Sequence, residues 1–214
     1  MKFFIDTAKV EEIKEALSWG ILDGVTTNPS HIAATGRPFL EVVREICELV
    51  HGPISVEVGS TTAPEMIEEA RKIAKMSKCI VVKVPVIREG IKAMKVLSAE
   101  GIKINATLNF SAVQALIAAK VGAAYISPFV GRLDDAGHYG MELVQQIKTI
   151  YDNYNFPTEI IVAAARNPLH VLDAALIGAH ITTMRFDIMK ALFEHPMTDT
   201  GLAQFLEDWA KVPK

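Results

Sequence analysis

Residues 79–107 read CIVVKVPVIREGIKAMKVLSAEGIKINAT, and this stretch contains the unit from which the rest of the chain is built. It opens with an apolar run at 79–84 and closes with a second run at 102–107. Both runs are largely apolar or β-branched on both faces, which is typical of strands covered on both sides of a parallel sheet. Between them, residues 88–100 carry apolar side chains at the spacing of an amphipathic helix. The stretch therefore predicts a strand, a helix and a second strand in succession.

The same alternation repeats along the whole chain without a linker or a low-complexity segment. Residues 63–76 and 139–153 continue the helical pattern. The eight apolar runs are Phe3–Asp6, Gly24–Thr27, Ile54–Val58, Cys79–Val84, Ile102–Thr107, Ala124–Ser127, Glu159–Ala164 and His180–Thr183. Eight strand–helix units in 214 residues predict a single (β/α)8 barrel of the TIM type with short loops.

The main rival fold is an open, doubly wound parallel sheet. Such a sheet that binds a dinucleotide carries a glycine-rich turn after its first strand, because only glycine lets the backbone approach the phosphates closely. Here the first strand is followed by Asp6-Thr7-Ala8-Lys9, which contains no glycine. The sequence therefore favours the barrel.

A last amphipathic stretch, residues 199–212, follows the eighth unit. Leu202, Phe205, Leu206 and Trp209 fall at helical spacing on one face of it. This apolar face can dock on the chain's own barrel or pack on a neighbouring subunit. We accordingly divide the chain into a barrel domain, residues 1–196, and a C-terminal helix, residues 197–214, for which the neighbouring subunit is the expected partner.

Composition excludes several classes of protein. The 22 basic and 25 acidic residues give a net charge of −3, which argues against a protein that coats nucleic acid or an anionic membrane. Cys47 and Cys79 make no disulfide framework, and no zinc-binding spacing is present, so neither a metal nor a cofactor is expected. No apolar run is long enough for a signal peptide or a membrane span, so we expect a cytoplasmic protein.

Polar residues stand where most of the predicted strands end, which is the end at which barrel enzymes carry their chemistry. They are Asp6, Thr26, Glu57, Lys83, Asn105, Thr107, Ser127, Arg166 and Arg185. A barrel interior filled only for stability would carry Val, Ile and Leu at these positions. The sequence therefore predicts a functional site at this end of the barrel.

Lys83 is the most informative of these residues, because it is the only charge in residues 79–86. Burial without a partner would lower the pKa of its ammonium group toward neutrality. A neutral amine can attack a carbonyl carbon and form a Schiff base. The alternative interpretations are that Lys83 pairs with a buried glutamate or that its side chain extends past the strand end.

Asp6 and Glu57 are candidates for the proton transfers that Schiff-base chemistry requires. The alternatives are that Asp6 caps a turn or helix at Thr7 and that Glu57 forms an ion pair with Lys83. Arg132 and Arg166 suit a phosphate group, because guanidinium donors match that anion. Two surface salt bridges are the alternative for the arginines. The six histidines show no shared ligand spacing, and we set them aside.

Five segments of the chain resemble the transaldolases, and most closely the small single-domain subfamily that also includes fructose-6-phosphate aldolase. The segments are Asp6-Thr7, Gly24–Ser30, Val82–Pro85, Glu100–Thr107 and Ser127–Arg132. The resemblance implies transfer of a dihydroxyacetone unit from fructose 6-phosphate or sedoheptulose 7-phosphate to erythrose 4-phosphate or glyceraldehyde 3-phosphate. It also implies a place in the non-oxidative pentose phosphate pathway and a homo-oligomer, a pentamer or a decamer of two rings.

The resemblance assigns roles to individual residues. It implies that Lys83 forms the Schiff base, that Asp6 handles the proton of the C4 hydroxyl, and that Glu57 and Thr107 hold a catalytic water. The implied substrate-binding residues are Thr26, Asn28, Asn105, Ser127, Phe129, Arg132 and Arg166, of which the two arginines clamp the phosphate.

Two positions favour a transferase over an aldolase. Glu57 and Phe129 stand where the aldolase type has Gln and Tyr, and a phenylalanine cannot relay a proton. Ala164 and Arg185 depart from the family's usual Ser and Pro. The alternatives to a transaldolase are a fructose-6-phosphate aldolase that releases dihydroxyacetone and a non-catalytic barrel that binds sugar phosphates.

Overall fold

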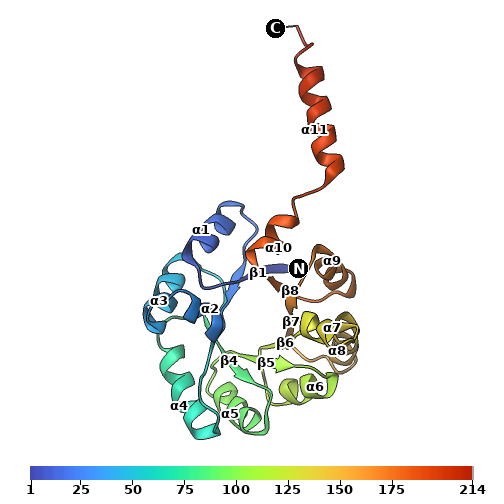
Figure 1. Ribbon diagram of the computed structural model, residues 1–214. Helices are drawn as coiled ribbons and strands as arrows, with labels where there is room; N and C mark the ends of the chain where they lie inside the picture. The colour runs from blue at the N-terminus through green and yellow to red at the C-terminus, as the bar shows by residue number, and fades with distance from the viewer. Residues whose placement is uncertain (214) are drawn as a thin grey trace.

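The computed structural model describes residues 1–213 and shows a closed barrel of eight parallel strands ringed by helices (Figure 1). The strands are β1 Lys2–Asp6, β2 Gly24–Thr26, β3 Ile54–Glu57, β4 Ile80–Pro85, β5 Ile104–Asn109, β6 Tyr125–Pro128, β7 Glu159–Ala165 and β8 Ile181–Met184. Each strand pairs in parallel with the next, and β8 closes the barrel on β1. The predicted (β/α)8 barrel is therefore confirmed, and each predicted strand overlaps an observed one.

The helices that cover the strands bury the faces that their apolar spacing predicts. The barrel helices are α1 Val10–Ser18, α2 Pro29–Ala34, α3 Phe39–Leu49, α4 Ala63–Ala74, α5 Arg88–Ala99, α6 Ala112–Lys120, α7 Val130–Asp135, α8 Gly140–Tyr154, α9 Pro168–Ile177 and α10 Phe186–Ala191. In α4, for example, Met66, Ala70 and Ile73 are buried against the sheet side. The helices expected at 63–76, 88–100 and 139–153 are confirmed within two residues at either end.

The interior of the barrel is layered. Its floor is an apolar cluster made of Phe4, Val81, Tyr125, Ile161 and Ile181, one residue from each of five strands. Because side chains alternate along a strand, the residues two positions further on face the same interior. These are Asp6, Lys83, Ser127, Ala163 and Thr183, and all five line one cavity above the floor. The apolar floor therefore supports a mostly polar layer at the carboxyl end of the barrel.

Gly24 lets the floor close. A Cβ atom at this position would lie 2.6 Å from a carbon of the Phe4 ring and 2.6 Å from the carbonyl oxygen of Pro53. The ring therefore fills the space that a side chain on β2 would need, and the fully buried Phe4 seals the barrel beneath the polar layer.

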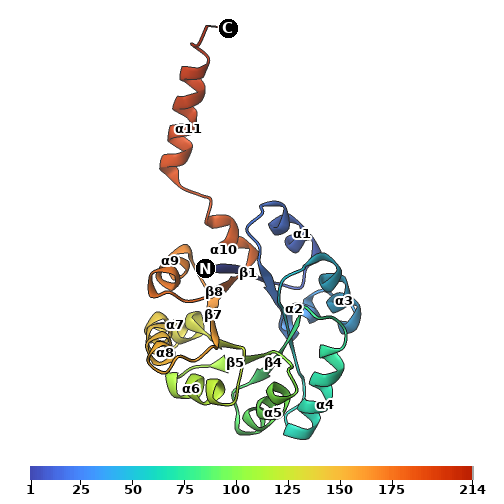
Figure 2. The ribbon, with the colours of Figure 1, turned by 180° about the vertical axis from the view of Figure 1, so that it is seen from behind.

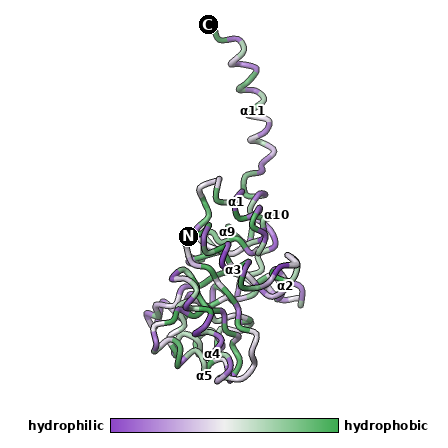
Figure 3. The backbone as a smooth tube through the Cα atoms, turned by 90° about the vertical axis from the view of Figure 1, so that its left-hand side faces the viewer, coloured by the Kyte–Doolittle hydropathy of each residue, from purple (hydrophilic) through white to green (hydrophobic). Residues whose placement is uncertain are grey.

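The last helix, α11 (Pro196–Trp209), extends away from the barrel (Figure 1, Figure 2 and Figure 3). None of its residues is buried, and Phe205 and Trp209 are 74% and 76% exposed. Docking on the chain's own barrel, one of the two placements considered, is therefore wrong. Within residues 1–213, no helix is long and apolar enough to cross a membrane.

Candidate active site

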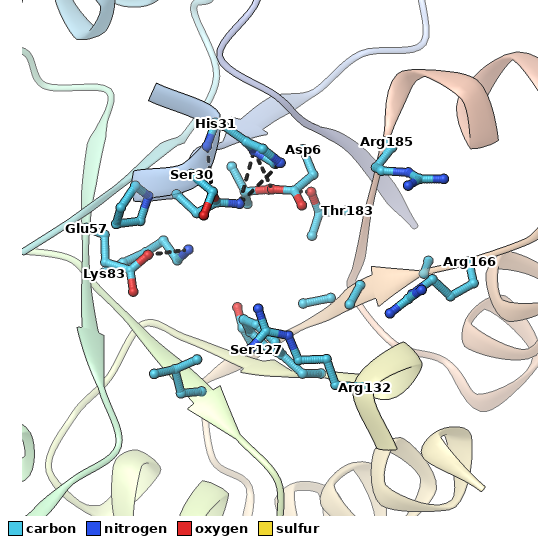
Figure 4. Close-up of a pocket in the computed structure, with 18 residues that line it drawn as sticks. Asp6, Ser30, His31, Glu57, Lys83, Ser127, Arg132, Arg166, Thr183 and Arg185 are labelled. Atoms are coloured by element: carbon cyan, nitrogen blue, oxygen red, sulfur yellow. Dashed lines mark hydrogen bonds and ion pairs between the residues drawn. The ribbon is translucent and has the colours of Figure 1, made fainter. Parts of the chain in front are cut away.

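A cavity of about 460 Å³ opens at the carboxyl ends of the strands (Figure 4). Nine of the eleven predicted site residues line it, and they are Asp6, Thr26, Asn28, Glu57, Lys83, Ser127, Phe129, Arg132 and Arg166. The structure thus brings together residues that are up to 160 positions apart in the chain, counted from Asp6 to Arg166. Asn105 and Thr107 are fully buried and do not line the cavity.

Lys83 extends into the barrel from β4 and is almost entirely enclosed, with 6% of its side chain exposed. Its Nζ atom donates hydrogen bonds to the carbonyl oxygen of Thr27 at 2.9 Å and to Oε2 of Glu57 at 3.0 Å. Glu57 and Lys83 are direct partners in the β3–β4 register, so the sheet itself sets this contact. The premise of a lysine without a partner is therefore corrected, and the ion pair considered as the alternative is present.

Asn105 is placed beneath the cavity wall rather than in it. Its Nδ2 donates to Oγ of Ser55 at 3.1 Å, and its Oδ1 accepts from Oγ of Ser127 at 2.7 Å. Asn105 therefore orients the Ser127 hydroxyl, which does reach the cavity. Thr107 lies two residues further along β5, and its buried Oγ1 has no hydrogen-bond partner among residues 1–213.

Asp6 stands at the end of β1 and faces the cavity rather than capping a helix. Helix α1 begins at Val10 with Lys9 as its N-cap, so the capping interpretation of Asp6 is wrong. The hydroxyl of Thr26 donates to Oδ1 of Asp6 at 2.7 Å and lies 2.6 Å from the Thr183 hydroxyl. A carboxylate held in this way keeps free acceptor capacity for a proton from a substrate.

Asn28 is fixed by the start of α2. As the N-cap it accepts, through Oδ1, the backbone N–H of His31 at 2.9 Å, and Pro29 occupies the first helical position. Its Nδ2 lies 3.0 Å from Nδ1 of the His31 ring. Sequence reasoning missed His31, which lines the cavity.

A short repeat could have pointed to His31. The sequence Asn-Pro-x-His occurs at 28–31 and again at 167–170, each time with one residue between the end of a strand and the asparagine. In the second copy Asn167 caps α9 in the same way, and Nδ1 of His170 accepts the backbone N–H of Arg166 at 3.2 Å. The other ring nitrogen of His170 lies 3.1 Å from Oδ2 of Asp134.

The two predicted phosphate arginines line the cavity from different elements, α7 and the end of β7. Arg132, on α7, lies over the ring of Phe129 at 5.2 Å. Arg166 follows β7, and its Nη2 pairs with Oδ2 of Asp135 at 2.5 Å, so the salt bridge considered as its alternative is present. Among residues 1–213, Arg132 has no acidic partner within 4.0 Å. Its guanidinium group is therefore available to an anionic ligand.

Gly131 allows the backbone of α7 to lie close to Ala164 and Arg166. A Cβ atom there would lie 2.2 Å from the carbonyl oxygen of Ala164 and 2.6 Å from Nε of Arg166. Ala164 itself has a φ of 58°, a left-handed conformation that costs an L-residue about 1–2 kcal/mol.

Arg185 also lines the cavity, with its guanidinium group paired to Asp187. In the described part of the chain, no group of three or more His, Cys, Asp or Glu side chains could hold a metal ion.

Comparison with known proteins identifies the family of this chain. The family model described as transaldolase/fructose-6-phosphate aldolase matches residues 3–214. The chain is 61% identical over 214 residues to a probable transaldolase of Aquifex aeolicus (strain VF5), covering 100% of this chain and 99% of the relative. It is also 61% identical to a probable transaldolase of Dictyoglomus turgidum, with 100% of both chains covered. A probable transaldolase of Coprothermobacter proteolyticus is 58% identical over 213 residues, covering 100% of this chain and 98% of the relative. With its resemblance confirmed over nearly its whole length, the chain belongs to the transaldolase/fructose-6-phosphate aldolase family.

Proposed function

We propose that this protein is a transaldolase that works through a Schiff base on Lys83. The donor is fructose 6-phosphate or sedoheptulose 7-phosphate, and the acceptor is erythrose 4-phosphate or glyceraldehyde 3-phosphate. The observation that carries the proposal is a primary amine enclosed at the cavity wall, with a carboxylate 3.0 Å away that can take up its proton. An amine relieved of its proton in this way can attack the C2 carbonyl of a ketose.

Glu57 serves both halves of imine formation. It first accepts a proton from the Lys83 ammonium, and it then returns a proton to the carbinolamine hydroxyl as that group leaves as water. The unbonded hydroxyl of Thr107 on β5 supports the expectation that a water is held near this pair. The product of this step is a protonated imine at C2, which withdraws electrons from the neighbouring bonds.

Asp6 supplies the base for bond cleavage. Its carboxylate takes the proton of the C4 hydroxyl, the C3–C4 bond breaks, and its electrons move into the imine to give an enamine on Lys83. The aldose phosphate leaves with a new C4 aldehyde. When an acceptor aldehyde binds, the enamine carbon attacks it and Asp6 returns its proton to the new hydroxyl oxygen. No proton or electron has to be supplied from elsewhere.

The phosphate of the sugar is held at the far side of the cavity from Lys83. Arg132 and Arg166 offer two guanidinium groups there, and phosphate accepts such paired donors well. Arg185 adds a third cation to the cavity lining. We infer that it compensates for the hydroxyl that the family's usual serine would provide where Ala164 stands.

Phe129 supports a transferase rather than an aldolase. Its ring packs edge-on against Phe110 with centroids 5.8 Å apart and lies under Arg132, so an apolar face borders the cavity. Such a face offers no hydroxyl that could relay a proton to the enamine carbon. The enamine therefore survives until an acceptor arrives, whereas an aldolase protonates it and releases dihydroxyacetone.

A coupled assay tests this function. The protein is incubated with fructose 6-phosphate, with and without erythrose 4-phosphate, and glyceraldehyde 3-phosphate is measured. Turnover that depends on the acceptor is expected, and release of free dihydroxyacetone without it identifies an aldolase instead. Borohydride reduction of the mixture should add the mass of a reduced dihydroxyacetone adduct to the peptide that carries Lys83. Ligand-induced stabilisation without turnover would leave only a sugar-phosphate binder.

We also propose that α11 packs on a neighbouring copy of this chain. The helix presents an exposed apolar face, and the barrel presents an apolar groove formed by the start of β1, α9 and the residues after α10. A helix on one copy that seats on the barrel of the next gives a head-to-tail contact, which closes into a ring where the rotation between copies permits. This supports the pentamer or double-ring decamer that the resemblance implies.

Two unpaired cysteines favour a reducing compartment, and we infer a cytoplasmic location.

A further inference from the structure

Two buried hydroxyl groups support the Asp6 carboxylate from within the barrel. Thr26 on β2 and Thr183 on β8 are 3% and 2% exposed, and their Oγ1 atoms lie 2.6 Å apart. Because β2 and β8 are the two neighbours of β1, this contact crosses the inner face of the strand that carries Asp6. Thr183 lines the cavity beside Asp6 (Figure 4), and the proposed function gives it no task.

The direction of these hydrogen bonds follows from the number of hydrogens that the groups carry. An ionised carboxylate only accepts, so Thr26 donates its single hydroxyl hydrogen to Oδ1 of Asp6 at 2.7 Å. In the 2.6 Å contact between the threonines, Thr26 therefore has to accept and Thr183 has to donate. The three groups form one chain of hydrogen bonds that runs from Thr183 through Thr26 to Asp6.

This chain fixes the orientation of the carboxylate. Within residues 1–213, the bond from Thr26 is the only hydrogen bond to the Asp6 side chain, and it occupies Oδ1, so Oδ2 stays free for a substrate proton. A hydroxyl that accepts one hydrogen bond is a stronger donor in the next, above all in a buried site. Without the Thr183 hydroxyl, the buried oxygen of Thr26 loses its donor, which is costly. We then expect Thr26 to turn toward water in the cavity and to release Asp6.

We propose that Thr183 is a positioning residue for bond cleavage, which acts through Thr26 to hold the Asp6 carboxylate toward the C4 hydroxyl of the donor sugar. This inference rests on the proposed transaldolase function. Lys83 and Glu57 stand on β4 and β3 and are not members of this chain of hydrogen bonds, so imine formation does not depend on it. Loss of the Thr183 hydroxyl should therefore slow cleavage and leave imine formation unchanged.

Three variants of β8 separate the hydroxyl from the rest of the side chain. Thr183→Val keeps the shape and the preference for a strand but removes the donor. Thr183→Ser keeps the donor and serves as the conservative variant. Thr182→Val is the matched control, because Thr182 is equally buried in β8 but points to the opposite face of the strand. Its hydroxyl contacts the sulfur of Met1 at 3.5 Å and does not line the cavity.

The experiment follows a single turnover. Fructose 6-phosphate is mixed with an excess of enzyme without an acceptor, and samples are reduced with borohydride at increasing times. The mass of the peptide that carries Lys83 distinguishes the intact hexose phosphate adduct, formed before cleavage, from the dihydroxyacetone adduct left after it. The sum of the two adducts reports imine formation, and conversion of the first into the second reports cleavage.

The two rates should respond differently in the variants. In T183V, conversion should be about five- to tenfold slower through loss of one hydrogen bond, while the summed adducts form as fast as in the unmodified protein. T183S should restore most of the conversion rate. T182V should convert at the rate of the unmodified protein.

An unchanged conversion rate in T183V overturns the inference, as does an equal slowing in T182V or in T183S. Slower formation of the summed adducts in T183V also overturns it, because that result indicates a general defect of the site. If the unmodified protein forms the adducts and conversion is equal in all four proteins, only the role of Thr183 is wrong. If the unmodified protein forms no adduct of either mass, the proposed function and the inference fall together.

Discussion

Lys83 and Glu57 are paired across β4 and β3, and their Nζ and Oε2 atoms lie 3.0 Å apart in an interior where 6% and 16% of the two side chains are exposed. The β3–β4 register thus places a carboxylate directly beside a buried ammonium group. Removing one partner of such a buried pair leaves an uncompensated charge, which costs about 3–5 kcal/mol. The pair therefore contributes to the stability of the barrel, and the proposed function gives it a second role in activating the amine.

Glu57→Gln should separate these two roles. Glutamine can still accept a hydrogen bond from Lys83, but it cannot take its proton, so the ammonium must lose its proton to solvent. Transferase kcat should fall about 10²-fold or more near pH 7 and recover partly as the pH rises. Steady-state assays from pH 6 to pH 9 measure this, with Glu41→Gln, an exposed residue of α3 outside the cavity, as the control. An equal pH dependence of kcat in the two variants would contradict the role given to Glu57.

Phe129→Tyr should turn part of the transferase activity into aldolase activity. The new hydroxyl would stand at the apolar face of the cavity and could pass a proton to the enamine carbon. Release of free dihydroxyacetone from fructose 6-phosphate without an acceptor should rise about tenfold or more. Phe110→Tyr, on the ring that packs against Phe129, is the matched control. Equal dihydroxyacetone release by the two variants would contradict a specific role for position 129.

His170→Gln should weaken the phosphate clamp. His170 accepts the backbone N–H of Arg166 and contacts Asp134 on α7, the helix that carries Arg132, so it ties the two arginines together. Loss of these contacts, each worth about 1 kcal/mol, should raise the KM for fructose 6-phosphate about tenfold. The rate with unphosphorylated fructose should change much less, because that sugar does not use the clamp. A parallel loss with both sugars would instead indicate a general structural defect.

Acid should destabilise the barrel through His180. Burial lowers the pKa of His180 below its ordinary value of 6.5, and its Nδ1 accepts the backbone N–H of Ile160 at 3.0 Å. The unfolded chain therefore binds a proton at a pH where the folded chain does not, so stability falls as the pH decreases through this range. His180→Asn keeps an acceptor near the Nδ1 position but cannot be protonated. Urea unfolding at pH 7.5 and pH 5.5 should show a smaller loss of stability in the variant, and an equal loss would exclude His180 as the cause.

The barrel could be predicted from the sequence because its strands are short, apolar on both faces and separated by amphipathic helices. The polar layer was also predictable, since Asp6, Lys83 and Ser127 interrupt runs that stability alone would fill with apolar residues. The finer backbone geometry of the site could not be predicted from the sequence. Leu108 and Ala164 both have a φ of 58° where the strand register shifts, and neither residue type signals a left-handed backbone.

The histidines show a second limit of sequence reasoning. We set them aside because their spacing fits no metal site, and that argument does not address what a helix cap does to a neighbouring side chain. An asparagine N-cap bonds the backbone of the third residue after it, and at Asn28 this brings the ring of His31 beside the cap's own amide. Only the structure shows that this ring also reaches Asp6.

The exposed face of α11 leads to a prediction about assembly. Phe205 and Trp209 are among the most exposed large apolar side chains of the chain, and exposing such a face to water is unfavourable unless a partner covers it. Phe205→Glu should therefore lower the mass measured by light scattering from that of a ring to that of a single chain. Glu207→Gln, on the same helix but off the apolar face, should leave the mass unchanged. Because every residue of the cavity lies in the barrel, the separated chains should still form the borohydride-trapped adduct on Lys83. If the unmodified protein is already a single chain at micromolar concentration, the proposed packing of α11 on a neighbouring copy is wrong.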